Sequence, residues 1–440
     1  MIPPSGPQAA RLSAGGALLL GLYAYLPLPA YLCLWIAWLV GPRGEGGLDW
    51  RLALRSLPPR GRRAIWFHAA SVGEISTIAP VVTEVRRAVP GVPIVVTTMT
   101  RGGARRAAEK LDGAEIVLVP FDFLPVVRRF VRAIEPACLV IGETEIWPNM
   151  IREAKRQGAA VVLVNGRISN KSHPRYKLIK FFLRHVLGLF DLLLMRSETD
   201  ARRIIELGAP ADRVEVAGNT KYDMLPEPVA ADRRKAIRRS LGLADLARVV
   251  ALGSAREGES EMVIRALAAC GNREGLHLVI APRHLDLVPQ IEQAAEALGW
   301  PALVLSDLRL PEGRPPAGVM ILAQMGRLLE IYAISDVAIV GGTLRPFGGH
   351  NPLEPASQGV ATVVGPYTHN IKDDMAYLTA RQAALVVDEA GLGPAVARLL
   401  ERDDVRLAMG QAAARAVLDR KGIAAGCVGE MARRGLLPRA

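Results

Sequence analysis

The strongest constraint on the fold is a series of short apolar runs that alternate with segments of helical periodicity. Between the runs lie segments such as "GGARRAAEKL" (102–111) and "PVVRRFVRAI" (125–134), whose apolar residues recur at three- and four-residue steps. Short apolar strands separated by amphipathic helices predict parallel sheets covered by helices on both faces. The runs are 64–70, 93–99, 115–121, 137–143, 160–166, 192–196 and 214–218, then 248–255, 276–283, 302–306, 319–323, 337–342, 361–365 and 384–388.

The alternation pauses at "DMLPEPVAADRR" (Asp223–Arg234), a polar segment with prolines that is typical of a linker. A chain of 440 residues is also longer than one compact core usually accommodates. We therefore predict two successive α/β domains, 46–224 and 225–440, after a separate segment 1–45. Each open sheet offers the carboxyl ends of its strands as a binding edge, and we expect the active site in a cleft between the domains.

Residues Leu12 to Pro42 contain no charged side chain, and this length exceeds the roughly 20 apolar residues that cross a bilayer. Pro27 and Pro29 interrupt the run, so a kinked span and a re-entrant or interfacial helix pair are both open, as is a buried helix. The stretch 51–63 that follows holds five Arg and no acid, which favours a cytoplasmic location for the rest of the chain. We expect a membrane anchor over 1–45.

Lys and Arg outnumber Asp and Glu by 55 to 43, a net charge of +12 that favours an anionic partner: nucleic acid, acidic membrane or phosphorylated substrate. The cysteines and histidines show no metal-ligand spacing, so no structural metal is expected. The absence of G-x-G-x-x-G and of G-x-x-x-x-G-K disfavours a dinucleotide oxidoreductase or a P-loop enzyme.

Polar residues follow several strands of the first predicted domain. Glu74 ends "HAASVGE" after the first run, where it could accept a proton from an attacking hydroxyl or simply stabilise a helix start. Glu143 and Glu145 in "GETEIWPN" lie at another strand end. Lys221 in "GNTKYD" could bind a sugar carboxylate or a phosphate, or be an ordinary surface lysine.

Three loops of the second domain suit a nucleotide. Arg283 in "APRH" could hold a phosphate. The segment "QMGRLLEIY" (324–332) opens a helix whose free N–H groups suit the same anion. In "GGHNPLEPASQG" (348–359) we expect Asn351 as helix cap, Pro352 at the first helical position, and Glu354 either completing a capping box or accepting ribose hydroxyls.

Together these motifs, with "NGRIS" and "GPYTHNIKD", resemble over nearly the whole chain the 3-deoxy-D-manno-octulosonic acid (Kdo) transferases of lipid A biosynthesis. The resemblance implies a GT-B architecture of two Rossmann-like domains facing a cleft, an N-terminal anchor in the bacterial inner membrane with the catalytic domains on the cytoplasmic side, and inverting transfer from CMP-Kdo to the lipid A precursor (lipid IVA). It implies Glu74 as general base and Glu143 and Lys221 as groups that stabilise the transition state. It assigns CMP to three segments: Pro282, Arg283 and His284; Met325, Gly326 and Arg327; and Asn351, Pro352, Leu353 and Glu354.

Two positions depart from the family pattern: Arg327 replaces a usual Glu, and "SAREGES" (254–260) replaces Ser-Thr-His-x-Gly-Glu-Glu. The absence of a D-x-D pair favours a leaving group that needs no metal, so we expect no cofactor. The basic segment 167–185 could meet anionic inner-membrane lipid or be an ordinary solvated helix, and we expect no nucleic acid partner. The alternatives are another GT-B lipid glycosyltransferase, a nucleotide-sugar epimerase and a non-catalytic sugar-nucleotide sensor.

Overall fold

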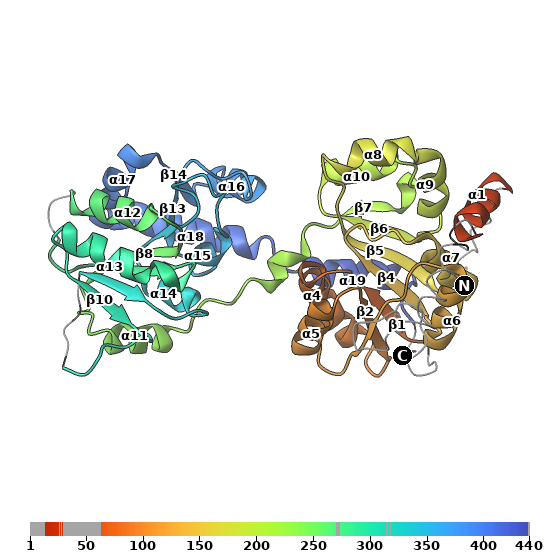
Figure 1. Cartoon of the computed structure of the whole chain (residues 1–440), viewed down its shortest axis with the longest axis horizontal. Coiled ribbons are helices and arrows are strands. Elements are labelled where there is room, and N and C mark those ends of the chain that lie inside the picture. The colour runs from red at the N-terminus through yellow and green to blue at the C-terminus, as the bar shows by residue number, and fades with distance from the viewer. Residues whose placement is uncertain are drawn as a thin grey trace. The chain divides into compact units, whose positions relative to one another are not determined.

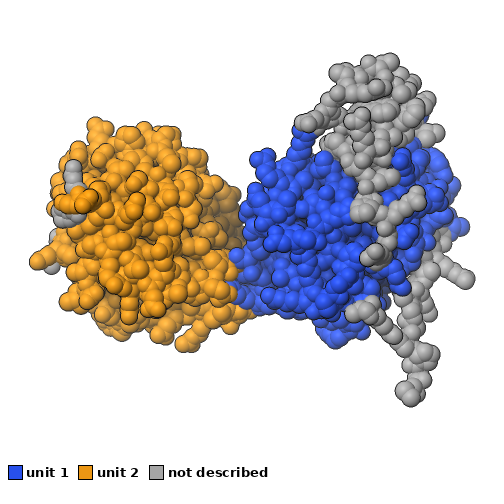
Figure 2. Space-filling view, turned by 90° about the horizontal axis from the view of Figure 1, so that it is seen from below, with its two compact units in different colours: residues 1–224, 420–440 blue, residues 225–419 orange. Residues whose placement is uncertain are grey.

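The computed structural model describes residues 14–25, 27, 29, 63–269, 273–313, 316 and 318–438. The chain divides into two compact units, which Figure 2 shows in different colours. Unit 1 comprises Met1–Met224 together with Arg420–Ala440, and unit 2 comprises Leu225–Asp419.

Unit 1 contains a seven-stranded sheet in the order β3-β2-β1-β4-β5-β6-β7, in which all neighbouring strands are parallel (Figure 1). Each apolar run predicted in this part of the chain is one of its strands. Their bounds are β1 Ile65–His68, β2 Ile94–Thr98, β3 Glu115–Leu118, β4 Cys138–Gly142, β5 Ala160–Gly166, β6 Leu192–Met195 and β7 Val214–Val216.

Two apolar clusters cover the two faces of this sheet. The side chain of Trp66 joins one cluster with Phe130 and Phe190, whereas its neighbours Ile65 and Phe67 join the other. Because successive side chains of a strand point to opposite faces, a strand buried on both faces must be apolar throughout. The covering helices are α4 Val72–Ala88, α5 Arg101–Lys110, α6 Leu124–Ile134, α7 Pro148–Arg156, α8 Ser172–Leu178, α9 Lys180–Leu187, α10 Glu198–Glu206 and α19 Ile423–Arg433.

Unit 2 repeats this architecture with the order β10-β11-β9-β8-β12-β13-β14, again parallel throughout. The predicted runs again coincide with the strands, which are β8 Arg248–Ala255, β9 Leu276–Pro282, β10 Ala302–Leu305, β11 Val319–Leu322, β12 Val337–Val340, β13 Ala361–Val364 and β14 Ala384–Val386. The helices are α11 Ala231–Ser240, α12 Glu259–Ala268, α13 Val288–Ala297, α14 Leu328–Ile334, α15 Leu353–Ser357, α16 Lys372–Thr379, α17 Glu389–Glu401 and α18 Asp403–Leu418.

The chain returns to unit 1 at its C-terminal end, whereas we had expected residues 225–440 to form one domain. Helix α19 buries Cys427, Val428 and Met431 in the cluster that contains Phe67. The Asp223 carboxylate fixes the start of this helix by accepting hydrogen bonds from the backbone N–H groups of Gly422 and Ala424. The expected second domain is therefore wrong for residues 420–440, because the apolar face of this helix packs against α4, near the start of unit 1.

Each sheet has a topological switch point, where two adjacent strands are followed by connections that lead in opposite directions. The switch point lies between β1 and β4 in unit 1 and between β8 and β12 in unit 2. Ligands of open α/β sheets bind beside the carboxyl ends of the strands at such points. The loops after these four strands are therefore the first places to look for chemistry.

Helix α1 (Ala14–Tyr25) packs against unit 1 beside α9. The Tyr23 hydroxyl donates a hydrogen bond to Asp122 at 3.1 Å, and its ring centroid lies 5.5 Å from that of Phe182. Within the described part of the chain, no helix combines the length and the apolar character that a membrane span requires. The rest of the expected anchor 1–45 falls almost entirely outside the described residues, so the anchor stays a prediction.

Candidate active site

Glu74 lies in the first turn of α4, directly after β1 at the switch point of unit 1. Ser71 is the N-cap, and its side chain accepts from the Glu74 backbone N–H. The Glu74 carboxylate accepts a hydrogen bond on each oxygen at 2.8 Å, from the Ala70 backbone N–H and from the Ser71 hydroxyl. Each carboxylate oxygen has a second lone-pair site, so capping leaves room for a substrate hydroxyl.

The electrostatic surroundings of Glu74 make it more basic than an ordinary glutamate. Burial raises the pKa of its carboxyl, the bonds from Ser71 and Ala70 lower it, and the charges of Glu145 and Glu143 raise it again. The net direction is upward. A carboxylate with a raised pKa is a better proton acceptor near neutral pH, which is the property a general base needs.

Glu143 and Glu145 follow β4, the neighbour of β1 at the switch point. Glu143 has a positive φ of 56°, a left-handed conformation that is uncommon for a residue with a side chain. Its backbone N–H donates to Val164 at 2.9 Å, while Glu145 accepts a hydrogen bond from the Trp147 indole at 2.9 Å. Backbone strain of this kind concentrates at functional sites, so the loop supports a role for these carboxylates beside Glu74.

Lys221 belongs to the 3-10 helix Thr220–Met224, which packs on α4. A buried hydrogen bond from the Thr220 hydroxyl to the Thr77 carbonyl, 2.7 Å long, joins this segment to α4 one turn after Glu74. Lys221 is exposed, and it forms no ion pair with any described residue. The segment that carries Lys221 is therefore fixed against the helix that carries Glu74, and its ammonium group remains available to an anion.

His68, the last residue of β1, is a buried polar group that we did not predict from the sequence. Its Nδ1 lies 2.9 Å from the Thr97 hydroxyl, and its ring packs edge-on against Trp147 with centroids 5.9 Å apart. Burial lowers the pKa of His68 to about 4, so the ring is neutral at physiological pH. His68 thus connects β1 to the loop that carries Glu145. The only signal for this residue in the sequence was its place at the start of "HAASVGE".

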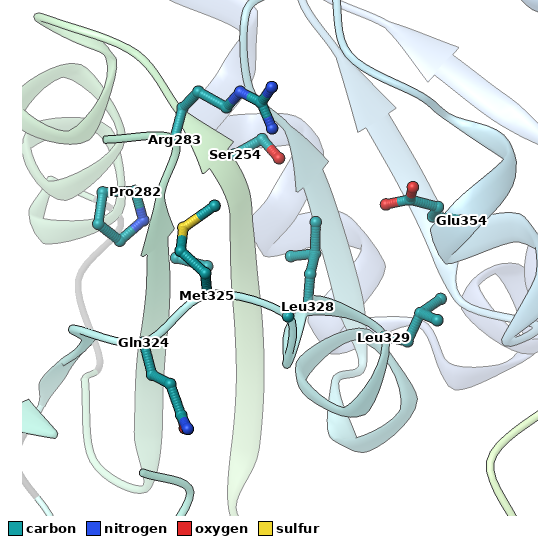
Figure 3. A pocket seen from close by; sticks show the side chains of 10 residues that line it. Ser254, Pro282, Arg283, Gln324, Met325, Leu328, Leu329 and Glu354 are labelled. Atoms are coloured by element: carbon teal, nitrogen blue, oxygen red, sulfur yellow. The ribbon is translucent and has the colours of Figure 1, made fainter. Parts of the chain in front are cut away.

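Unit 2 contains a cavity of about 280 Å³ at the carboxyl ends of its strands. Five of the predicted nucleotide residues line it: Pro282, Arg283, Met325, Gly326 and Glu354. Figure 3 shows Arg283, Ser254 and Met325 on one side of the cavity and Glu354 on the other, with Leu328 between them. An apolar floor between a cation and a carboxylate suits a ligand with a flat ring, hydroxyls and an anionic group.

Ser254 forms part of this cavity because β8 is irregular at that point. The register between β8 and β9 shifts between Gly253 and Ala255, and Ser254 has a positive φ of 57°. A bulge next to a binding site re-aims the side chain and ends the strand pairing. Asn165 of unit 1 shows the same combination in β5, with a φ of 55° and a hydrogen bond from the Thr220 backbone N–H to its side chain.

Glu354 lies in the short helix α15, which begins one residue later than we expected. The cap is Pro352 rather than Asn351, although the Asn351 side chain still accepts from the Leu353 backbone N–H at 3.1 Å. Glu354 accepts from the Asn351 side-chain amide at 3.4 Å and not from a backbone N–H, so the expected capping box is absent. Burial raises the pKa of Glu354, while the bond from Asn351 and the charge of Arg283 lower it, and the net direction is upward.

The remaining predicted residues lie around the cavity rather than on it. Leu353 is buried in the core, and Asn351 is exposed. Arg327 forms ion pairs with Asp307 and Glu330, both at 3.0 Å, and Glu330 also binds Arg233. Arg327, which departs from the family pattern, therefore takes part in a network of ion pairs at the surface and does not line the cavity. Helices α14 and α15 have only seven and five residues, so their dipoles contribute little and Arg283 is the main charge for a phosphate.

Glu259 explains how the loops around the cavity are fixed, and the sequence alone did not reveal it. Its fully buried carboxylate accepts hydrogen bonds from the backbone N–H groups of Arg256, Gly342, Leu344 and Arg345. These donors belong to the loops after β8 and β12, the two strands of the switch point. Glu259 is the second acid of "SAREGES", and it holds the two loops together.

Nowhere in the described ranges do three or more His, Cys, Asp or Glu side chains gather in a way that could hold a metal ion. The two sheets, each with polar loops at its switch point, define a protein of the GT-B class. In agreement, a UDP-GlcNAc 2-epimerase from Neisseria meningitidis, solved with UDP-GlcNAc bound, has a similar structure, with a TM-score of 0.57 at 12% identity over 84% of this chain and 100% of that chain. At this identity the likeness concerns the fold alone.

Sequence comparison identifies the family. Residues 47–224 match the family described as 3-deoxy-D-manno-octulosonic-acid transferase (kdotransferase). The 3-deoxy-D-manno-octulosonic acid transferase of Chlamydia trachomatis is 31% identical over 78% of this chain and 79% of its own length. A bifunctional glycosyltransferase/methyltransferase of Fusobacterium nucleatum is 34% identical over 70% of this chain, which spans 48% of that protein. The chain belongs to the Kdo transferase family, as its motifs predicted, and is a glycosyltransferase.

Proposed function

We propose that this protein transfers Kdo from CMP-Kdo to the lipid A precursor lipid IVA, with inversion at the anomeric carbon. The observation that carries the proposal is the position of Glu74: a carboxylate with a raised pKa at the switch point of unit 1, in a chain of the Kdo transferase family. A non-catalytic sensor would have no need for a base in this position.

In the proposed reaction, Glu74 removes the proton from the acceptor hydroxyl as its oxygen attacks the anomeric carbon of Kdo. The bond between this carbon and the phosphate oxygen breaks, and CMP leaves from the opposite face with the bonding electrons. Glu143 and Lys221 stabilise the transition state of this transfer. Glu74, Glu143 and Lys221 belong to unit 1, whereas the proposed nucleotide site belongs to unit 2.

For the donor, we propose that the cytosine and ribose of CMP occupy the cavity of unit 2. Met325, Gly326 and Leu328 supply its apolar floor, Glu354 accepts ribose hydroxyls, and Arg283 neutralises the phosphate. CMP leaves with a single phosphate group, so one guanidinium can provide the compensating charge without a divalent cation. The transfer is accordingly proposed to be independent of metal.

For the acceptor, we propose that unit 1 rests on the anionic inner-membrane surface on its cytoplasmic side. Leu178 at the end of α8, Ile179 between the two helices and Phe181 in α9 are exposed, and they lie among Lys and Arg residues of the segment 167–185. Leu18 and Leu22 of α1, the helix packed beside α9, are exposed as well. Apolar side chains surrounded by basic ones suit the headgroup region of an anionic bilayer.

Donor selectivity tests the proposed activity. The purified protein is incubated with CMP-Kdo or UDP-GlcNAc, each with and without lipid IVA, and both the free nucleotide and the nucleotide sugars are identified and quantified. We expect CMP to be released from CMP-Kdo only when lipid IVA is present, and no turnover of UDP-GlcNAc. Conversion of UDP-GlcNAc to another nucleotide sugar without acceptor would indicate an epimerase, and no change in either nucleotide sugar would indicate a sensor.

A further inference from the structure

Four basic side chains converge beside the nucleotide cavity of unit 2, and a single phosphate does not account for all of them. They are Arg256 after β8, Arg283 and His284 after β9, and His350 after β12. Burial lowers the pKa of His350, and the nearby basic groups Arg283, Arg256 and His284 lower it further, so all three lie near His350. Neither Arg256 nor Arg283 forms an ion pair with a carboxylate of the described residues.

Arg256 determines which ring nitrogen of His284 carries the proton. Its Nη1 lies 3.1 Å from His284 Nε2. An arginine can only donate, so Nε2 is the acceptor and the proton of the neutral ring is on Nδ1. The guanidinium also packs over the ring of Phe347, 4.6 Å from its centroid. Arg256 is therefore held in place, and His284 keeps one N–H available for a ligand.

His350 adds an unused polar atom to the cluster. Its imidazole packs against Gly342, where a Cβ would come within 2.9 Å of the ring and where φ is +73°. Its Nε2 is buried and has no hydrogen-bond partner among the described residues. A buried nitrogen without a partner costs free energy unless a ligand satisfies it.

The donor that we propose carries two anionic groups, the phosphate and a carboxylate, both attached to the anomeric carbon. We infer that Arg256, together with His284 and His350, binds this carboxylate, while Arg283 and Glu354 hold the nucleotide. This inference rests on the proposed function. The planar guanidinium of Arg256 matches a carboxylate with two parallel N–H groups, and the two imidazoles can supply further donors.

The inference gives a role to a residue that departs from the family pattern. Arg256 carries a permanent positive charge. Arg256 thus determines donor specificity: it distinguishes a nucleotide linked to a sugar acid from the nucleotide alone. A site for the phosphate only would make no such distinction.

Calorimetry on the full-length protein without acceptor tests the assignment, with CMP and CMP-Kdo as the two probes. We expect Arg256→Gln to bind CMP within about twofold of wild type and to bind CMP-Kdo about 10- to 100-fold more weakly, the loss typical of a charge-assisted pair. Arg256→His should keep part of the wild-type affinity for CMP-Kdo that Arg256→Gln loses. As the matched control, Arg273→Gln removes another arginine that packs over an aromatic ring of unit 2, that of Trp300, and should change neither affinity.

Equal weakening of both probes would overturn the inference, because Arg256 would then serve the phosphate. Unchanged binding of CMP-Kdo to Arg256→Gln would overturn it as well, while leaving the proposed function intact if wild type still binds CMP-Kdo more tightly than CMP. Failure of wild type to bind either probe would instead overturn the proposed function, and the inference with it. Thermal melts of each variant establish that it is folded.

Discussion

Replacing Glu74 by Gln separates its possible role as a base from its role as a helix cap. In the structure one carboxylate oxygen accepts from the Ala70 N–H and the other from the Ser71 hydroxyl. The Gln carbonyl can keep the first bond, and the Gln amide can donate to the Ser71 oxygen. The variant therefore loses only the charge at a helix start, which costs about 1 kcal/mol or less. As a base, by contrast, the amide is useless, and we expect turnover to fall by roughly 10²- to 10⁴-fold.

The assay compares the rate of transfer, the melting temperature and the affinity for CMP in wild type and Glu74→Gln. Asp200→Asn is the matched control, because Ser197 and Asp200 form the same kind of cap at the start of α10. This control should have a similar or larger stability loss and near-normal turnover. If Glu74→Gln turned over at nearly the wild-type rate, the reasoning would be refuted, and Glu143 or Glu145 would be the next candidates for the base.

Three further predictions concern the nucleotide, the metal and the core. Glu354→Gln should weaken CMP binding by roughly 1.5–3 kcal/mol in calorimetry with an almost unchanged melting temperature, because the amide loses a charge-assisted acceptor; unchanged affinity would leave this loop structural. Transfer should continue in excess EDTA, and loss of activity that magnesium restores would contradict the leaving-group argument. The lowered pKa of His68, about 4, means that its contribution to stability is present above its unfolded pKa near 6.5 and is lost as pH falls toward 4. Urea unfolding should show about 2 kcal/mol less stability from His68 at pH 5 than at pH 7.5, and His68→Gln should lack this part of the pH dependence; an equal dependence in both proteins would exclude His68 as its source.

The strands of both sheets could be predicted because a strand buried on both faces must be apolar along its length. Ile65, Trp66 and Phe67 illustrate this, since all three are fully buried although they face different clusters. The C-terminal helix could not be placed in the same way. Its apolar residues Cys427 and Met431 would fit a core of either unit, and only the packing against unit 1 decides between them.

The candidate site was predictable to the extent that it follows strand ends. Glu74, Glu143 and Arg283 all lie there, because parallel strands bring their carboxyl ends to one edge of a sheet. The direction of individual side chains was not predictable. Arg327 turns to Asp307 and Glu330 rather than to the cavity, and Glu259 binds the backbone of two loops. Such choices depend on neighbours that are distant in sequence.

The most direct test of the proposed transfer is the mass of the lipid product after incubation of the purified protein with CMP-Kdo and a tetraacylated lipid A precursor. The account predicts a lipid heavier by one or more Kdo residues, with an anomeric configuration opposite to that of the donor by NMR, and no such product with Glu74→Gln. An unmodified lipid in the presence of wild-type protein that binds CMP-Kdo would contradict it, and so would a product that retains the configuration of the donor.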